Sequence, residues 1–198
     1  MKRSELKKQA KQSLKGNWGI SILCLFIGGF VMGALSWTVI GTLIVTGPIA
    51  IGLCVYFMTV INNKKAELND FIKGATTNLD NIIVTGVLVS IFTFLWSLLL
   101  IIPGIIKSYS YAMTYYIQFD HPEMSETDAI TASREMMKGH KWELFMLDLS
   151  FIGWYLLVPL TFGWIMLYVA PYQNATKAAF YLNLKNQQGP EIITEGNN

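Results

Sequence analysis

Three long apolar blocks, separated by polar segments that hold most of the charges, constrain this chain more than any other feature. The first block runs from residue 18 to residue 61 without a single charged side chain. A helix rises 1.5 Å per residue and needs about 20 residues to cross the roughly 30 Å hydrocarbon core of a bilayer. The first block is about twice that length. We therefore predict that it folds as a pair of antiparallel membrane helices.

The other two blocks have the same character. One spans residues 82–119 and is interrupted only by Lys107, and the other spans residues 142–184. Only 14% of all residues are charged and 53% are hydrophobic, which leaves too little polar surface to cover a soluble domain. The sequence predicts an all-α polytopic transmembrane bundle of six spans, arranged as three helical hairpins at 17–61, 82–119 and 142–184.

The polar segments between the hairpins indicate the orientation of the chain. Lys and Arg concentrate in them, and basic connectors remain in the cytoplasm of membrane proteins. An even number of spans returns the chain to its starting side, so we expect both termini inside. The membrane domain is predicted to cover 17–184, followed by a polar tail at 185–198. We expect a multi-pass protein of the bacterial cytoplasmic membrane.

The segment 1–16 is predicted to be a basic interfacial helix. Its apolar residues Leu6, Ala10 and Leu14 are spaced by four, which places them on one helical stripe. Basic side chains near an anionic leaflet attract lipid headgroups. The candidate contacts to anionic lipid are Lys2, Arg3, Lys7, Lys8, Lys11 and Lys15. The alternative is that these charges only fix the topology.

The insert 120–141 predicts one cytoplasmic amphipathic helix. Ser125 and Asp128 form a capping-box-like start, and Gly139 is a suitable stop. Its apolar positions are expected on the membrane face, with the basic residues toward headgroups or water. These apolar positions are Ala129, Ile130, Met136 and Met137.

An internal repeat relates the first and third hairpins. A shift of 123 residues aligns LKGNW (14–18) with MKGHKW (137–142), with one inserted residue, and Gly47-Pro48 with Ala170-Pro171. The middle hairpin keeps a weaker version, with Lys73-Gly74 at its start and Pro103-Gly104 within it. The sequence thus predicts three parallel hairpin repeats, with Pro48 and Pro171 inside returning helices that they would kink. For Pro103, a position inside a helix and a position at a span end remain alternatives.

A few polar residues fall inside the predicted membrane helices. Asp148 and Lys177 lie at the same depth, about 10 Å inside the inner boundary, so they are expected to pair. The corresponding residues of the first repeat are Cys24 and Cys54. With Lys107 and Asn174, the pair forms a candidate intramembrane polar site. The alternative is a structural ion pair with hydrogen bonds between helices.

The sequence carries no motif for catalysis or metal binding. It contains no HExxH, no GxSxG and no paired carboxylates on a helical face. Neither His121 nor His140 has a second ligand at a suitable spacing, and Cys24 and Cys54 form no CxxC pair. We therefore expect no enzyme activity, no metal, no cofactor and no binding of nucleic acid.

Three segments carry a resemblance to a known family. They are IPGIIKSYSYAM (102–113), AITASREMMKGHKWELFMLDLSFIGW (129–154) and LTFGWIMLYVAPYQNATKAAFY (160–181), and LKGNW also resembles the start of that family. The chain is similar to the bacterial membrane proteins grouped as domain of unknown function 975. The resemblance implies a multi-span membrane protein, distantly similar to the membrane region of some glycerophosphodiester phosphodiesterases. It assigns no catalytic residues.

Two functional hypotheses follow. The first is a noncatalytic membrane module that binds lipid, through anionic headgroups, or a partner membrane protein. The second is a small transporter or channel with a polar site between kinked helices. A membrane enzyme acting on lipids would require an acid and a base that converge in a cavity.

Overall fold

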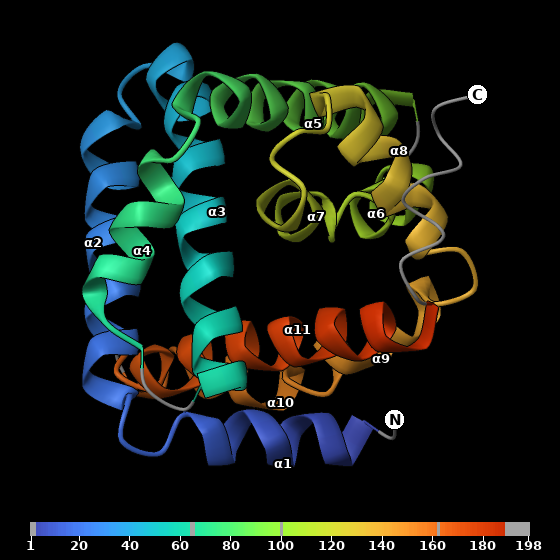
Figure 1. The fold of residues 1–198 in the computed structure, drawn as a ribbon. Helices are drawn as coiled ribbons and strands as arrows, with labels where there is room; N and C mark the ends of the chain where they lie inside the picture. The colour runs from blue at the N-terminus through green and yellow to red at the C-terminus, as the bar shows by residue number, and fades with distance from the viewer. Residues whose placement is uncertain (1–2, 64–65, 100, 162, 189–198) are drawn as a thin grey trace.

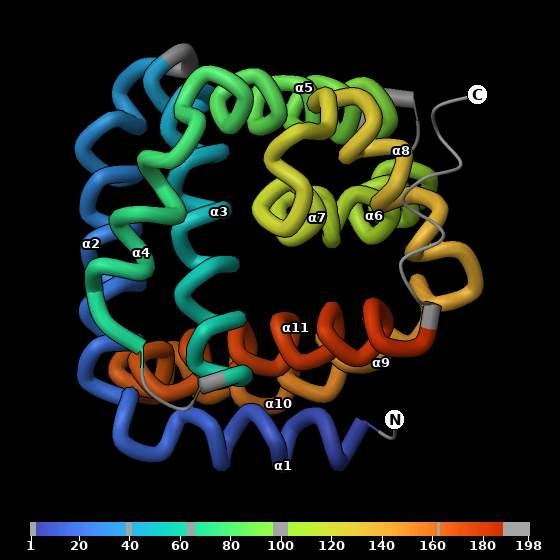
Figure 2. The backbone as a smooth tube through the Cα atoms, in the orientation of Figure 1, coloured from blue at the N-terminus to red at the C-terminus, as the bar shows by residue number. Residues whose placement is uncertain are grey.

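The computed structural model describes residues 3–63, 66–99, 101–161 and 163–188, and every regular element among them is an α-helix (Figure 1). This agrees with the all-α fold class predicted from the sequence. The helices form three successive groups along the chain. Each group consists of a short helix followed by an outgoing and a returning helical arm, and Figure 2 shows the path of the backbone through them.

The first group contains α1 (Arg3–Ser13), α2 (Trp18–Leu35) and α3 (Val39–Asn63). Helices α2 and α3 run antiparallel and pack against each other, as predicted for the first hairpin (Figure 1). Pro48 lies inside α3, which confirms its predicted position in the returning helix.

The second group contains α4 (Leu68–Thr76), α5 (Leu79–Leu99), α6 (Ile101–Ser110) and α7 (Thr114–Asp120). Helices α6 and α7 run back along α5, so the returning arm is divided into two short helices (Figure 1). Pro103 is the third residue of α6. The first turn of a helix tolerates proline because its backbone N–H groups have no partner inside the helix. Pro103 therefore marks the start of a returning helix.

The third group contains α8 (Glu126–Met136), α9 (Lys141–Leu149), α10 (Ile152–Tyr155) and α11 (Met166–Gln188). Its outgoing arm consists of the short helices α9 and α10 and not of one long helix. Pro171 lies inside α11, as predicted. The start of α8 is also confirmed, because the Ser125 hydroxyl accepts a hydrogen bond from the Asp128 N–H at 3.2 Å.

Three helical segments are long and apolar enough to cross a membrane: Trp18–Leu35, Gly41–Asn62 and Leu79–Trp96. Much of the first and third segments is exposed, and Phe26, Phe30 and Phe94 project large apolar side chains from them. Half of the second segment is buried, because α3 contacts α1, α2, α4, α5, α7 and α11. Helix α3 is therefore the central helix of the fold.

A residue with left-handed backbone conformation precedes each hairpin. These residues are Gly16 (φ 89°), Asn78 (φ 55°) and Gly139 (φ 80°), separated by 62 and then 61 residues. Glycine adopts this conformation without strain, and asparagine tolerates it better than most side chains. The three groups of helices therefore share this local start. The middle repeat, however, begins its hairpin at Asn78 and not at Lys73-Gly74, because Gly74 lies within α4.

Glycines allow the neighbours of α3 to approach it closely. A Cβ atom added to Gly86 of α5 would lie 2.7 Å from the Cα of Gly47, and one added to Gly74 of α4 would lie 3.1 Å from the Cα of Gly52. Small residues at helix crossings are typical of membrane proteins, where van der Waals contact between backbones supplies much of the packing energy. Both crossings therefore depend on the absence of a side chain.

The apolar faces of the two predicted amphipathic helices point into the protein. Leu6, Ala10 and Leu14 are buried in the core, where α1 packs against α11 and α3. The prediction that α8 places its apolar side on the membrane is wrong. All four residues of that side are buried: Ala129, Ile130, Met136 and Met137. The short helices thus pack their narrow apolar stripes against the hairpins, where these residues are buried.

Candidate functional site

The predicted pairing of Asp148 with Lys177 is confirmed. The Lys177 Nζ lies 3.2 Å from the Asp148 Oδ1, across the interface between α9 and α11. The Asp148 side chain is 19% exposed and that of Lys177 is 35% exposed. Both charges therefore keep some access to the surface, which lowers the cost of holding them in a largely apolar protein.

Uncharged polar groups from three helices complete this cluster. The Gln173 Nε2 donates to Asp148 Oδ1 at 2.9 Å, and the Tyr109 hydroxyl donates to Oδ2 at 3.3 Å. The Tyr155 hydroxyl donates in turn to the Gln173 Oε1. We call Tyr109, Asp148, Tyr155, Gln173 and Lys177 the polar network. It joins α6, α9 and α11 through one carboxylate and reaches α10 through Gln173.

The structure does not bring Lys107 and Asn174 into the polar network. The Lys107 Nζ lies over the ring of Trp96, 4.3 Å from its centroid, in a cation–π contact with α5. The Asn174 Nδ2 donates to the carbonyl of Ala170 in its own helix at 2.9 Å. The four predicted residues therefore divide into one pair and two separate side chains.

Equivalent positions of the three repeats meet in the core. Cys54, Tyr116 and Lys177 are separated by 62 and 61 residues, the same intervals that separate the left-handed residues. The Cys54 thiol and the Tyr116 hydroxyl form a hydrogen bond, and the charge of Lys177 acts on the same thiol. Only the third repeat places a charge at this position. Sequence periodicity predicted the correspondence of Cys54 with Lys177 but not its extension to Tyr116.

A second polar cluster lies where α7 ends. The Asp120 Oδ2 accepts hydrogen bonds from the Tyr181 hydroxyl and from the Lys185 Nζ, each at 2.6 Å. The ring of Tyr181 stacks on that of Tyr116 at 4.9 Å between centroids. Sequence reasoning missed this cluster, because Asp120 and Lys185 both fall at block boundaries, where charges are expected in any case.

The basic face of α1 points away from the protein. Four of its six predicted lipid contacts are exposed: Arg3, Lys8, Lys11 and Lys15. Lys7 instead donates to the Ser150 carbonyl at 3.2 Å and lies 4.0 Å from the ring centroid of Phe151. Burial lowers the pKa of Lys7, and the neighbouring charge of Arg3 adds to the effect. Lys2 lies outside the described residues.

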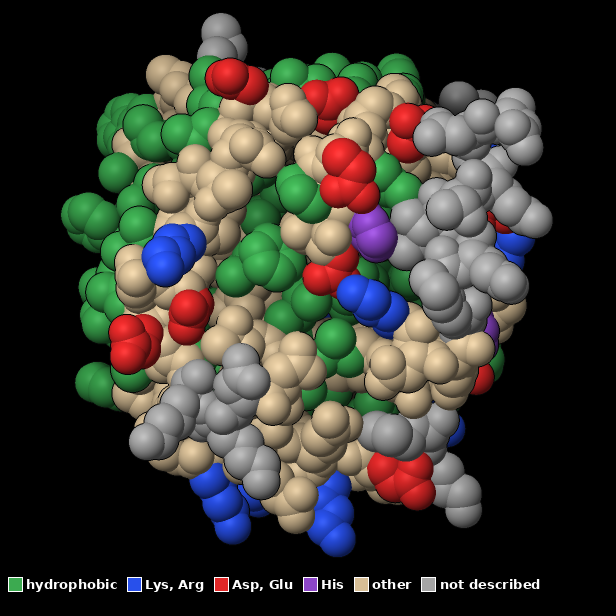
Figure 3. All heavy atoms as spheres, in the orientation of Figure 1, with side chains coloured by type: hydrophobic (Ala, Val, Ile, Leu, Met, Phe, Trp, Pro, Cys, Tyr) green, Lys and Arg blue, Asp and Glu red, His purple; other side chains and the backbone are tan. Residues whose placement is uncertain are grey.

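The face shown in Figure 3 carries Asp, Glu, Lys, Arg and His side chains among smaller apolar areas. The Nδ1 of His121 lies 3.1 Å from Glu123 Oε1. Hydrogen bonds from the local backbone and from His121 lower the pKa of Glu123. Within the described part of the chain, no group of three or more His, Cys, Asp and Glu residues is placed to hold a metal ion.

Comparison with known proteins bears on the region that contains the polar network. Residues 98–188 match the family model described as "Protein of unknown function (DUF975)". This region is similar to DUF975 domains. It extends from the end of α5 to the end of α11 and includes all five members of the polar network. The resemblance of the three segments between residues 102 and 181 is thereby confirmed, whereas LKGNW (14–18) lies outside the match.

No curated protein and no solved structure matches the chain. The distant similarity to glycerophosphodiester phosphodiesterases therefore has no support from these comparisons. The basic helix α1 and the first hairpin lie outside the matched region. The chain thus combines a domain that holds the polar network with an N-terminal region that holds the exposed basic face.

Proposed function

We propose that this chain is a multi-span protein of the bacterial cell membrane and acts as a noncatalytic module that binds anionic lipid. The proposal includes the six-span arrangement, with both termini in the cytoplasm. Three apolar helices of sufficient length support membrane insertion. Each of the three groups has a short helix, a left-handed residue and then two helical arms, and this repetition supports three hairpins that insert in the same way.

The observation that carries the lipid-binding proposal is the orientation of α1. Its apolar side is fixed against α11 and α3, so its exposed cations cannot rotate toward the protein. Each cation close to an anionic leaflet contributes about 1 kcal/mol of attraction. Arg3, Lys8, Lys11 and Lys15 therefore form a preorganised surface for phosphate headgroups.

Thermal unfolding of the full-length chain in detergent tests this proposal. Phosphatidylglycerol should raise the melting temperature more than phosphatidylcholine does, since a ligand that binds only the folded state stabilises it. Substituting Arg3, Lys8, Lys11 and Lys15 by Gln should abolish this difference. The control variant replaces Lys73, Arg134, Lys138 and Lys141 by Gln and should preserve it. An equal response to both lipids in the unsubstituted chain would refute the proposal.

The polar network favours a second candidate function, that of a small transporter. The Asp148 carboxylate of α9 is contacted by side chains of α6 and α11 and is partly exposed, which suits an internal polar site. This function requires water to reach the network. Gln173→Cys should then react with a water-soluble thiol reagent, whereas Ala178→Cys, at a fully buried position, should not. Complete protection of Gln173→Cys would identify the network as a dry structural element.

A further inference from the structure

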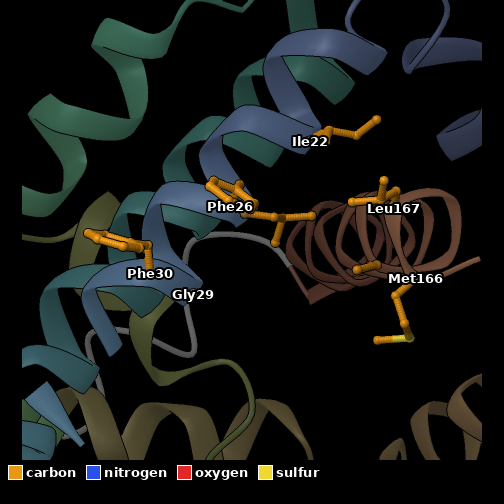
Figure 4. Close-up of a pocket in the computed structure, with 8 residues that line it drawn as sticks. Ile22, Phe26, Gly29, Phe30, Met166 and Leu167 are labelled. Atoms are coloured by element: carbon orange, nitrogen blue, oxygen red, sulfur yellow. The ribbon is translucent and has the colours of Figure 1, made fainter. Parts of the chain in front are cut away.

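A groove lies between α2 of the first group and α11 of the third, and the side chains of the protein do not fill it. Helices α2 and α11 enclose an open space of about 350 Å³, shown in Figure 4. Ile22, Phe26 and Phe30 line it from α2, and Met166 and Leu167 line it from α11. Its volume is within the range of ligand pockets, about 300–1,000 Å³. Every lining residue is apolar or glycine, so the occupant must present hydrocarbon.

An aromatic pair continues from the groove toward α1. Trp18 precedes Ile22 by four residues and so lies on the same face of α2. Its ring stacks on that of Tyr168, which follows Leu167 in α11, at 4.8 Å between centroids. Both rings can contact hydrocarbon with their apolar bodies and polar groups with their tips. Because Trp18 is the first residue of α2, the pair lies at the end of the groove nearest α1.

Cations lie beyond this aromatic pair. Lys11 is in the last turn of α1 and Lys15 is in the turn that leads into α2, and both are exposed. The N-terminus of α2 adds the partial positive charge of a helix dipole at the same end. Cations, aromatic pair and apolar groove thus follow one another in the order of a phospholipid's headgroup, glycerol region and acyl chain.

We infer that the groove between α2 and α11 binds one acyl chain of an anionic phospholipid whose headgroup contacts Lys11 and Lys15. This inference rests on the proposed function and narrows it, from a basic surface that attracts many lipids to a site for a single lipid. Charge complementarity selects the anionic headgroup. The apolar lining selects the chain.

Native mass spectrometry of the detergent-purified full-length chain tests the site. Phosphatidylglycerol should be retained as one molecule per chain, and phosphatidylcholine with the same acyl chains should bind about tenfold more weakly, since it lacks the net negative charge. Substituting both Lys11 and Lys15 by Gln should remove this difference. Substituting Lys73 and Lys138 by Gln should not. Equal retention of the two lipids by the unsubstituted chain would overturn the inference.

Two glycines of α2 provide a matched pair of variants for the groove. Gly29 lines the groove and Gly33 does not, and a Cβ added at either would meet no atom within 4 Å. Gly29→Phe should fill the groove and abolish retention of phosphatidylglycerol. Gly33→Phe should retain it. Normal retention by Gly29→Phe, with the lipid-dependent melting shift unchanged, would overturn the groove site while leaving the proposed function intact.

A photoreactive acyl chain provides a readout on the unsubstituted protein. Phosphatidylglycerol with a diazirine near the middle of one chain should label peptides that contain residues 22–30 and 166–170. Labelling confined to α5 and α6 would contradict the assignment. Mass spectra dominated by a lipid-free dimer would show that a second copy covers the groove. If neither the spectra nor the melting experiment distinguished the two lipids, the inference and the proposed function would fail together.

Discussion

The first and third hairpins follow the same plan but are held together by different contacts. Each begins after a left-handed glycine, Gly16 or Gly139, and each returns through a helix that contains a proline. Gly28 of α2 allows Ile49 of α3 to approach closely, since an added Cβ would lie 3.1 Å from its side chain. In the third hairpin, by contrast, hydrogen bonds and an ion pair centred on Asp148 join the two arms.

This difference shows that the hairpin plan does not itself require buried charges. Cys24 and Cys54 occupy the positions that correspond to Asp148 and Lys177, and both are buried in the apolar core. The ion pair is therefore a feature of the third hairpin and not of the repeat. Four predictions test the contacts within and between the hairpins, and all four are measured by unfolding of the full-length chain in detergent.

The largest effect is expected from Gly47→Ala. Its new Cβ would overlap the Ile82 carbonyl oxygen, a backbone atom of α5 that cannot move without displacing the helix. Such overpacking should cost more than about 3 kcal/mol or prevent folding altogether. Gly153→Ala in α10 is the control, because its Cβ would meet no atom within 4 Å. Equal stability of the two variants would show that the close crossing of α3 and α5 is unimportant.

The next largest effect is expected from Lys177→Met. Removing one partner of an ion pair leaves the other charge without compensation, which costs about 3–5 kcal/mol when the pair is fully buried. Asp148 keeps its bonds from Tyr109 and Gln173 and some exposure, so we expect about 2 kcal/mol. Cys54→Ala, at the equivalent position of the first repeat, should cost less. The contrast between the hairpins would be wrong if Cys54→Ala were the more destabilising substitution.

Hydropathy and periodicity predicted the parts of this fold that depend on simple physical rules. Apolar length predicted the helices of the first hairpin, and equal depth on antiparallel arms predicted the contact of Asp148 with Lys177. The division of the outgoing arm into α9 and α10 was not predicted, because it depends on tertiary contacts. The same holds for Lys7, whose bond to Ser150 joins segments 143 residues apart.

The orientation of the short helices could not be predicted either. An apolar stripe such as that of α8 fits a membrane surface and a protein surface equally well, and the sequence alone does not say which is nearer. Hydrogen bonds decide the matter for α8. The Ser133 hydroxyl donates to the Ser110 carbonyl at 2.8 Å and accepts from the Met113 N–H at 3.2 Å.

A smaller effect is expected when both charges of the pair are removed together. Asp148→Asn combined with Lys177→Met keeps an acceptor for Tyr109 and eliminates the uncompensated charge. The double variant should lose only about 1 kcal/mol and be more stable than Lys177→Met alone, because paired sites are not additive. If the losses simply added, the two side chains would not be energetically coupled.

The smallest effect is expected from Lys7→Met. This side chain links the first repeat to the third through the Ser150 carbonyl and the Phe151 ring. Loss of one hydrogen bond and one partly exposed cation–π contact should cost about 0.5–1 kcal/mol. Lys8→Met, at the neighbouring exposed position, should leave stability unchanged. An equal loss for both variants would indicate a general effect of charge and not this specific link.

The central claim, that three hairpins enter and leave the membrane from one side, is tested most directly by cysteine labelling in intact cells. Both native cysteines are buried, so background reaction should be low. With a thiol reagent that cannot cross the membrane, Trp37→Cys should be labelled, because Trp37 is 94% exposed between α2 and α3. Lys73→Cys and Lys138→Cys should react only after the membrane is opened. Labelling of one of these two lysine positions, but not the other, in intact cells would contradict the account.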